Sequence, residues 1–572
     1  MTRARLLICL IVAAALLTAL PAQAQEEGNT AERVRIAWPQ YDGTLTPYTF
    51  PGERGYPLLT LVYDTLLWRD QSGMAEPWLA RQIRRNEAGT RITVVLRDGA
   101  SFHDGRPVTA EDVKFSYDYF AERYQQRFTP QLEAIESTEV VDDLTVVFNL
   151  EHPAPGFDQP LSDVPILPRH LWEDLPSGET PPGMPVGSGP YRLVESDPEA
   201  GYVFRANEDY FLGRPRVATL ELPFNSDFAA TVRAFRSRDL DMIPVTLPDD
   251  TQEDVTGPSF ETERGRLYEG TALMFNLREA PFDSKRARQA VSAALDLERI
   301  TKNAAGIDER TFPADRGYVH PRSGLATRNK LHRFNPEFAR AELAELDLPP
   351  ITVLAPAKDP FRSEAGRQVV LALERAGVDV ELELVPFDEL ATAVGAAGDK
   401  GSPRFEAAIW SISPLPSSSA DTLRQVFGSD EREAPLNYMG YSSEEFDRLA
   451  ELTSKETNPE KRFARIREEI ELLNQDLPVV PLFYPEGAFV VNPNIYQGWQ
   501  YVEGKGILDK RSFLPPPRIR AGDTAPDAAA PAAPAGDSGG GIGVGAAIAL
   551  GLVGIVLAVI LVGVVRRRAR GT

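Results

Sequence analysis

The sequence has almost no cysteine: Cys9 is the only one in 572 residues. It lies in an apolar N-terminal run that we expect to be removed with a signal peptide. The mature chain then has no thiol, which excludes a disulfide, a cysteine-ligated metal and a cysteine nucleophile.

Motifs for other kinds of catalysis are missing as well. No pair of histidines has His-x-His or His-Glu-x-x-His spacing among His103, His152, His170, His320 and His332. There is no Gly-x-Ser-x-Gly elbow, and the segment Gly187-Ser188-Gly189 favours a backbone crossover over a nucleophile. We therefore expect no enzyme activity, no catalytic residue, no cofactor and no metal. A metal site built from distant histidines stays open as the alternative.

Positive charge is scarce. The chain has 61 basic and 83 acidic residues, a net charge of −22. Six of the basic residues lie in two end segments that contain no acid, so the part between them carries −28. Nucleic acid and anionic lipid surfaces are poor partners for such a body.

Both ends of the chain carry targeting features. Residues 1–24, with a basic start, an apolar run and a small-residue cleavage site, are predicted to be a signal peptide. Residues 516–541 are rich in Pro, Ala and Gly and are predicted to be a flexible linker. The uncharged run 542–565 can cross a bilayer, and the basic tail 566–572 is expected in the cytoplasm by the positive-inside rule. We expect a single-pass protein of the cell membrane with a large extracellular or periplasmic domain.

A histidine beside an aspartate, His103-Asp104, is a candidate catalytic pair. The surrounding stretch, RITVVLRDGASFHDGRPVTAEDVKFSYDYF, predicts instead a strand over 92–96, a turn at the pair, and a helix capped by Thr109 and Asp112. We interpret the pair as part of a structural turn.

The middle of the chain has α/β patterning. A strand at 351–357, a helix at 363–376 and a strand at 378–385 predict a βαβ unit with a parallel sheet. The stretch FEAAIW, residues 405–410, predicts a further buried strand.

Two more helices have recognisable starts. Ser442 and Glu445 have the spacing of a capping box. Asn458-Pro459 is predicted to begin the next helix.

Six stretches together resemble one family. They are RITVVLRDGASFHDGRPVTAEDVKFSYDYF (91–120), PVGSGPYRLVE (185–195), NEDYFLGRPRVATLEL (207–222), LMFNLREAPFDSKRARQAVSAALDLERI (273–300), NYMGYSSEEFDRL (437–449) and QDLPVVPLFYPEGAFVV (475–491). In order and spacing, they resemble extracellular solute-binding protein family 5, the oligopeptide-, dipeptide- and nickel-binding receptors of ABC importers. The resemblance spans residues 32–510.

The resemblance implies an α/β fold, a two-lobed periplasmic-binding-protein-like clamp of the class II type with an extra subdomain inserted in its first lobe. The first lobe would comprise 32–58, 186–270 and 479–515, the inserted subdomain 59–185, and the second lobe 271–478. The chain would cross the hinge twice, and the predicted C-terminal transmembrane helix would follow.

The function implied by the resemblance is solute binding. The lobes would close on a peptide or a related small solute, which would then be delivered to the permease subunits of an ABC importer. We expect a monomer without a nucleic-acid partner. Two other functions stay open: a ligand-sensing receptor that acts through a partner membrane protein, and an extracellular hydrolase.

Ligand contacts are expected at strand ends, because open parallel sheets bind ligands at the carboxyl ends of their strands. Trp410 ends FEAAIW, at the position of a tryptophan in the family, and could form an aromatic wall or pack in the core. Phe275 and Asn276 belong to a strand that the resemblance places at the hinge, where packing and ligand binding are equally open. The candidate ligand residues are Trp38, Gln40, Tyr41, Asp42, Phe275, Asn276, Trp410, Ser411 and Ser413.

One position departs from the family. Peptide-binding members commonly carry an aspartate three residues after this tryptophan, and it pairs with the α-ammonium group of the peptide. Here Ser413 stands in its place. The ligand could therefore be a peptide, an oligosaccharide or a metal chelate.

Overall fold

The structure is a computed structural model of the whole chain. It describes residues 30–515 apart from 40, 42, 44, 48–54, 126, 177, 226–227, 246–258, 267–269, 306–310, 396–402 and 413–419. The described residues all belong to the first of two compact units, 1–529 and 530–572. The predicted signal peptide, linker, transmembrane helix and basic tail therefore lie outside the described residues.

Residues 31–223 contain two four-stranded sheets and a two-stranded sheet, β2 (Leu67–Arg69) with β3 (Ala75–Pro77). In the first, β1 (Ala31–Arg35) runs parallel to β10 (Val217–Pro223), and β9 (Gly201–Ala206) and β8 (Tyr191–Asp197) continue the sheet antiparallel. The second is antiparallel in the order β4 (Ala80–Arg85), β5 (Arg91–Leu96), β7 (Thr145–Leu150), β6 (Ile135–Asp142). The same region contains α3 (Tyr56–Val62), α4 (Ala110–Glu122), η2 (Thr129–Gln131), α5 (Asp158–Asp163) and α6 (Arg169–Trp172).

The strand and helix predicted around His103 are confirmed. Ile92, Val94 and Leu96 of β5 are buried and alternate with more exposed residues, as expected for a strand with one face on a core. Helix α4 begins directly after Thr109. The Asp112 carboxylate accepts hydrogen bonds from the Thr109 backbone N–H at 2.9 Å and its hydroxyl at 2.8 Å. The carboxylate thus ties the preceding turn to the first turn of the helix.

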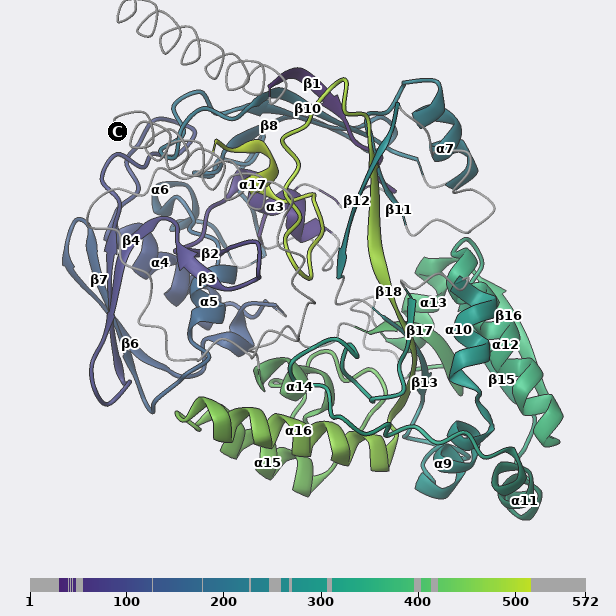
Figure 1. Cartoon of the computed structure of the whole chain (residues 1–572). Helices are drawn as coiled ribbons and strands as arrows, with labels where there is room; N and C mark the ends of the chain where they lie inside the picture. The colour runs from purple at the N-terminus through teal and green to yellow at the C-terminus, as the bar shows by residue number, and fades with distance from the viewer. Residues whose placement is uncertain are drawn as a thin grey trace, which may run out of the picture. The chain divides into compact units, whose positions relative to one another are not determined.

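A larger sheet is built mostly from later residues (Figure 1). Its strand order is β11 (Met242–Val245), β18 (Val479–Val491), β13 (Gly270–Phe275), β17 (Ala407–Ile412), β15 (Ile351–Pro356), β16 (Val380–Val385). β12 (Glu261–Arg266) and β14 (Thr311–Pro313) also pair with β18. β15 and β16 are parallel and are connected by α12 (Pro360–Ala376), which confirms the predicted βαβ unit. The helix begins earlier than predicted because the Asp359 side chain caps it, accepting from the Arg362 N–H at 2.9 Å.

One strand, β18, joins two regions of the molecule. Residues 479–483 pair with β13, and residues 486–491 pair with β11 and β12. Figure 1 shows β18 as a single long arrow between these neighbours. A bend or twist of this strand would therefore move one region relative to the other.

The apolar core is divided in the same way. The first core, as we call it, draws its buried side chains from residues 34–243 and 489–514. The second core draws on residues 272–484 and covers both faces of the large sheet. Leu273, Phe275 and Ile409 lie on one face, and Ala272, Met274 and Ala408 on the other.

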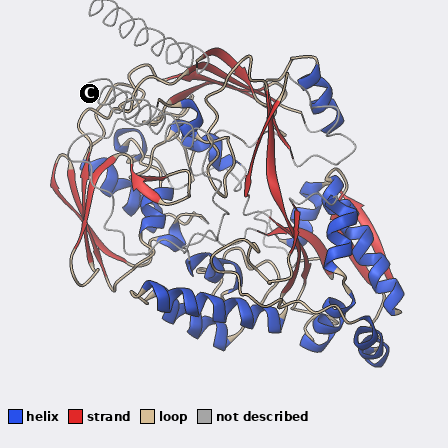
Figure 2. Cartoon of the chain, viewed as in Figure 1, coloured by secondary structure: helices blue, strands red, loops and turns tan. Residues whose placement is uncertain are grey.

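Among the described residues, the two longest helices, α12 and α16, both contribute to the second core; Figure 2 shows the helices in blue. Helices α9 and α12 pack on the face of Leu273, and α13 to α16 on the face of Ala272. The bounds not given so far are α7 (Phe228–Arg236), α9 (Lys285–Ala294), α10 (Leu297–Ala305), α11 (Pro336–Leu346), α13 (Phe387–Val394), α14 (Ala420–Phe427), α15 (Glu444–Ser454), α16 (Pro459–Asp476) and α17 (Lys510–Phe513).

One predicted cap is wrong and one is confirmed. Helix α15 is capped by Ser443, whose hydroxyl accepts from the Phe446 N–H at 3.3 Å, and not by Ser442. The helix begins one residue late because the Asn437 side chain holds both backbone groups of Tyr441 in the preceding turn. Helix α16 begins as predicted, with Asn458 as its cap.

A fully buried ion pair closes the first core. The ammonium nitrogen of Lys510 lies 2.8 Å from the Asp64 carboxylate, and both side chains are 0% exposed. The same carboxylate oxygen accepts from the Trp78 indole at 2.8 Å and from the Tyr210 hydroxyl at 3.0 Å. Three segments that are far apart in sequence, 64–78, the one with Tyr210 and the one with Lys510, therefore meet at one carboxylate.

Replacing Lys510 by methionine is expected to destabilise the protein by about 3–5 kcal/mol, because it leaves the Asp64 charge buried and unpaired. Urea unfolding of the full chain, followed by tryptophan fluorescence, measures the loss. Lys285→Met is the matched control: this lysine is 48% exposed in its ion pair with Asp476. The control should cost less than about 1 kcal/mol. Equal losses for the two variants would contradict a structural role of the buried pair.

Candidate functional site

Trp410 lies within β17 rather than at its end, because the strand extends to Ile412. Its half-buried ring stacks on Phe387 at a centroid distance of 5.8 Å with an interplanar angle of 10°. The Tyr438 ring meets it edge-on at 6.1 Å. One face of the indole is therefore covered by Phe387, and the three rings form an aromatic corner.

Asn276 is connected to this corner by hydrogen bonds. The Arg278 guanidinium donates to the backbone oxygen of Tyr438 at 2.8 Å and to the Asn276 side-chain oxygen at 3.5 Å. Burial lowers the pKa of Arg278, although the charge of Glu431 opposes this effect. The structure thus brings Asn276 and Trp410 into one neighbourhood.

Phe275 has the surroundings of a core residue. It is 0% exposed, and its ring centroid lies 4.4 Å from that of Phe282. Asn276 is also buried, at 4% exposure. Of the two roles that the sequence left open for Phe275, burial favours packing.

Trp38 and Tyr41 pack in the first core, apart from the second-core cluster that contains Trp410. Trp38 is 5% exposed and its backbone pairs with that of Phe224. Tyr41 is half-buried and stacks on Tyr202 at 5.7 Å.

Of the remaining candidate ligand residues, only Ser411 lies within the described part of the chain. Ser411 is half-buried on β17, opposite Thr271. Gln40, Asp42 and Ser413 lie outside the described residues.

His103 and Asp104 do not form a pair with each other. The His103 ring places Nε2 3.0 Å from the Gly189 oxygen, and Nδ1 accepts from the Gly187 N–H at 3.3 Å. Asp104 instead contacts the ring of His170 at 2.6 Å. His103 therefore holds the turn against the Gly187–Gly189 segment.

A serine, a histidine and an aspartate do come close together in this region, but they lack the geometry of a catalytic triad. Ser188 is 0% exposed, and its hydroxyl lies 3.5 Å from the Asp64 carboxylate. Both ring nitrogens of His103 are engaged by backbone groups, so neither can take a proton from Ser188.

The glycines on either side of Ser188 are needed for close packing. A Cβ on Gly187 would lie 2.1 Å from the Val62 oxygen, and one on Gly189 would lie 2.3 Å from the Leu61 oxygen. The predicted backbone crossover is thus a contact with the end of α3.

A polar cluster around Asp163 was not predicted. The buried Asp163 carboxylate lies 3.9 Å from the Arg69 guanidinium and 3.5 Å from that of Arg127. The amides of Gln131 and Gln159 donate to it at 3.4 Å and 3.2 Å. The cluster joins three segments, at Arg69, at 127–131 and at 159–163, that carry no common motif.

A third cation, Lys505, adds to this cluster. Its ammonium nitrogen lies 4.5 Å from the centroid of the Trp68 ring and 5.8 Å from that of Tyr56. Burial, followed by the positive charge of Arg69, lowers the pKa of Lys505 to about 8. The cluster therefore has more positive than negative charge.

A groove of about 670 Å³ separates residues 130–160 from residues 424–455. Gln131 and Gln159 line it, so the cluster around Asp163 adjoins the groove. Arg424 bridges the two sides, 3.5 Å from Glu133 and 2.9 Å from Glu433.

The described residues contain neither a cluster of metal ligands nor a membrane-spanning helix. No three His, Asp or Glu side chains in that part of the chain are grouped as a metal site. Within the same residues, no helix has the length and apolar character needed to cross a bilayer.

Two apolar cores that share one strand, β18, define a two-lobed α/β fold. The model of the family described as "Bacterial extracellular solute-binding proteins, family 5 Middle" matches residues 75–433. The chain belongs to this family, which confirms the resemblance inferred from the six stretches.

Individual relatives agree with this assignment. The oligopeptide-binding protein AppA of Bacillus subtilis is 25% identical over 473 residues, which cover 77% of this chain and 84% of AppA. The structure of AppA with a nonapeptide superimposes with a TM-score of 0.75 at 21% identity, over 85% of this chain and 100% of AppA. NikZ of Campylobacter jejuni, with Ni(L-His), gives a TM-score of 0.72 at 23% identity, over 81% of this chain and 94% of NikZ. The solved structures establish the two-lobed periplasmic-binding-protein fold.

Protonation of His103 is expected to lower stability in acid. Burial lowers the pKa of His103 from 6.5 to about 4. As the pH falls from 6.5 to 4, the unfolded chain gains a proton that the folded chain refuses, so the free energy of unfolding falls by about 3 kcal/mol. The His103→Gln variant should not show this fall in the free energy of unfolding, because a glutamine amide keeps a donor and an acceptor but does not titrate.

The measurement is urea unfolding of both proteins at several pH values between 7 and 4. Titratable groups that both proteins share cancel in the difference between their free energies of unfolding. If the free energies of the wild type and of His103→Gln changed with pH in the same way over this range, the result would contradict a buried neutral His103.

Proposed function

We propose that this protein is a membrane-anchored extracellular receptor that closes on a peptide or a related small solute and delivers it to an ABC importer. The family match over residues 75–433 carries the proposal. AppA binds a nonapeptide and NikZ a nickel–histidine complex, so ligands of different chemistry fit this fold. Function requires no bond to be made or broken, and we propose that the protein is not an enzyme.

We propose the following division of the clamp. The first lobe is 32–58, 186–270 and 479–515, with residues 59–185 inserted, and the second lobe is 271–478. Support comes from the split apolar core and from β18, whose two halves pair with strands on either side of the proposed hinge. Such a clamp closes when its ligand binds the closed state more tightly than the open one.

We propose Trp410 as a ligand-contacting residue, with Asn276 and Ser411 beside it. The half-buried ring of Trp410 and the neighbouring Tyr438 support this role, because aromatic rings bind planar or apolar groups. The proposed ligand-binding set is drawn from both lobes and faces the cleft between them. Its other members are Trp38, Gln40, Tyr41, Asp42 and Ser413.

Membrane attachment belongs to the same proposal. The sequence supports a cleaved signal peptide 1–24, a linker 516–541, a transmembrane helix 542–565 and a cytoplasmic tail 566–572. A linker rich in Pro, Ala and Gly would let the receptor work near its permease without a fixed orientation. We propose that the receptor acts as a monomer.

The experiment is to purify the full chain from its native membrane and identify the molecules bound to it by mass spectrometry. We expect a peptide or similar small solute, at most one per chain. Adding this solute back to stripped protein should raise Tm, and the solute should be recovered unchanged. Its conversion to a product would contradict the receptor and favour the hydrolase.

The Trp410→Ala variant tests the proposed site with the same solute. We expect its Kd to rise about tenfold, because a stacked ring contributes about 0.5–1.5 kcal/mol beyond the area that it buries. Phe338→Ala, which removes a ring that is 45% exposed on α11, is the control and should bind as the wild type does. Equal affinities of the two variants would remove Trp410 from the site.

A further inference from the structure

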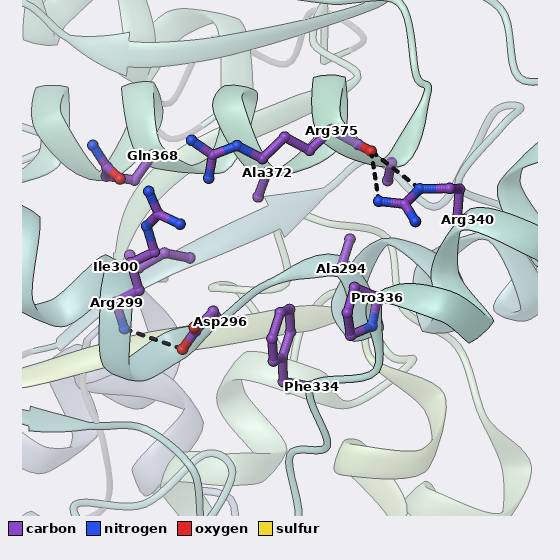
Figure 3. A pocket seen from close by; sticks show the side chains of 11 residues that line it. Ala294, Asp296, Arg299, Ile300, Phe334, Pro336, Arg340, Gln368, Ala372 and Arg375 are labelled. Atoms are coloured by element: carbon purple, nitrogen blue, oxygen red, sulfur yellow. Dashed lines mark hydrogen bonds between the residues drawn. The ribbon is translucent and has the colours of Figure 1, made fainter.

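A second pocket lies between helices of the second core (Figure 3). Its volume is about 140 Å³, and α10, α11 and α12 contribute most of its walls. None of the ligand residues proposed above lines it. The lining residues are Ala294, Asp296, Arg299, Ile300, Phe334, Pro336, Arg340, Gln368, Ala372, Arg375 and Ala376.

The charges of the pocket are unbalanced. Three arginines face a single acid, Asp296, whose carboxylate already accepts from the backbone N–H of Arg299 at 3.1 Å. The Arg340 guanidinium is held by the backbone oxygen of Arg375, at 3.3 Å from two of its nitrogens. In the described part of the chain, the guanidinium groups of Arg299 and Arg375 have no hydrogen-bonding or ionic partner.

Two basic residues near the pocket, unlike Arg299 and Arg375, are paired with acids. Arg286 of α9 pairs with two glutamates of α11, Glu342 and Glu345. On α12, Glu364 accepts from Arg367 and Gln368. In the region around the pocket, two exposed arginines are thus left available to an anion from outside.

Apart from Gln368, the rest of the pocket is apolar. Ile300 is 2% exposed and closes the pocket beside three alanines, whereas the Phe334 ring is 49% exposed. In Figure 3, the guanidinium groups of Arg299 and Arg375 point to the same side as the Gln368 amide, and Phe334 and Pro336 lie opposite. A cavity of about 150 Å³ holds a benzene ring, so a ring of that size matches the volume here.

We infer that this pocket is a second binding site, for a small organic anion with a carboxylate attached to a ring. The carboxylate accepts from Arg299 and Arg375, and the ring packs on Phe334 and Ile300. Charged hydrogen bonds to guanidinium groups provide the selectivity for an anion, and burial of the Phe334 ring adds affinity. The site is independent of solute binding at Trp410 and does not rest on the proposed function.

Equilibrium dialysis of the full chain in detergent against radiolabelled benzoate tests the inference, with micelles alone as the blank. We expect one benzoate per chain. Benzamide, which has the same shape without the charge, and acetate, which has the charge without the ring, should each compete at least about tenfold more weakly.

Variants locate the site. Arg299→Gln and Arg375→Gln should each weaken benzoate binding about three- to tenfold, and Phe334→Ala about threefold or more. Arg328→Gln removes the charge of another exposed arginine, one that does not line the pocket, and should leave binding unchanged. Trp410→Ala should also leave it unchanged, which separates this site from the proposed cleft.

Three results would overturn the inference. The first is that no benzoate binds at about 10 mM, a concentration at which even a weak carboxylate site is occupied. The second is that benzamide competes as strongly as unlabelled benzoate does. The third is that the Arg375→Gln and Arg328→Gln variants bind benzoate with equal affinity.

Discussion

The buried contact between Asp64 and Lys510 is the constraint on which the rest of the structure depends. Two charges are removed from water and repay that cost only if both stay paired and hydrogen-bonded. Trp78 and Tyr210 supply the extra hydrogen bonds to Asp64, and the Lys510 ammonium also lies 4.0 Å from the Trp68 ring. The pair thus fixes the C-terminal segment in the first core.

The C-terminal segment that Lys510 fixes is continuous with β18, the strand that joins the two cores. The strand leads from the second core into the C-terminal segment, residues 492–515, which contains Lys510. Both halves of β18 are held by strand pairs, with β13 on one side and with β11 and β12 on the other, so motion of one core relative to the other would bend or twist the strand. In the proposed clamp, such a bend would let the two lobes close around a solute while each keeps its own apolar core intact.

Local sequence patterns predicted local structure well. The alternation of Ile92, Val94 and Leu96, the cap at Thr109 and the βαβ unit are encoded within a few residues, and the structure confirms them. The error at Ser442 has a local cause too, since two adjacent serines are equally good caps and a contact from Asn437 decides between them. The family was also recognisable, because six stretches keep their order along the chain.

Long-range contacts could not be predicted in this way. Asp64 and Lys510 are 446 positions apart, and the cations around Asp163 come from three distant segments. No periodicity or spacing connects such residues. Trp410 was likewise predicted to lie in a strand, but its contacts with Phe387 of α13 and with Tyr438 of a loop depend on how these distant segments pack.

The central claim is that binding closes one lobe on the other. Cys9 is the only native cysteine, so Glu199→Cys and Lys358→Cys, both at exposed positions, can carry a fluorescent donor and acceptor on the two lobes. A second pair, Glu199→Cys and Glu87→Cys, lies within the first lobe and serves as the control. Adding the co-purified solute to stripped protein should change the transfer efficiency of the first pair and leave the second unchanged. A bound solute with unchanged efficiency for the first pair would contradict closure.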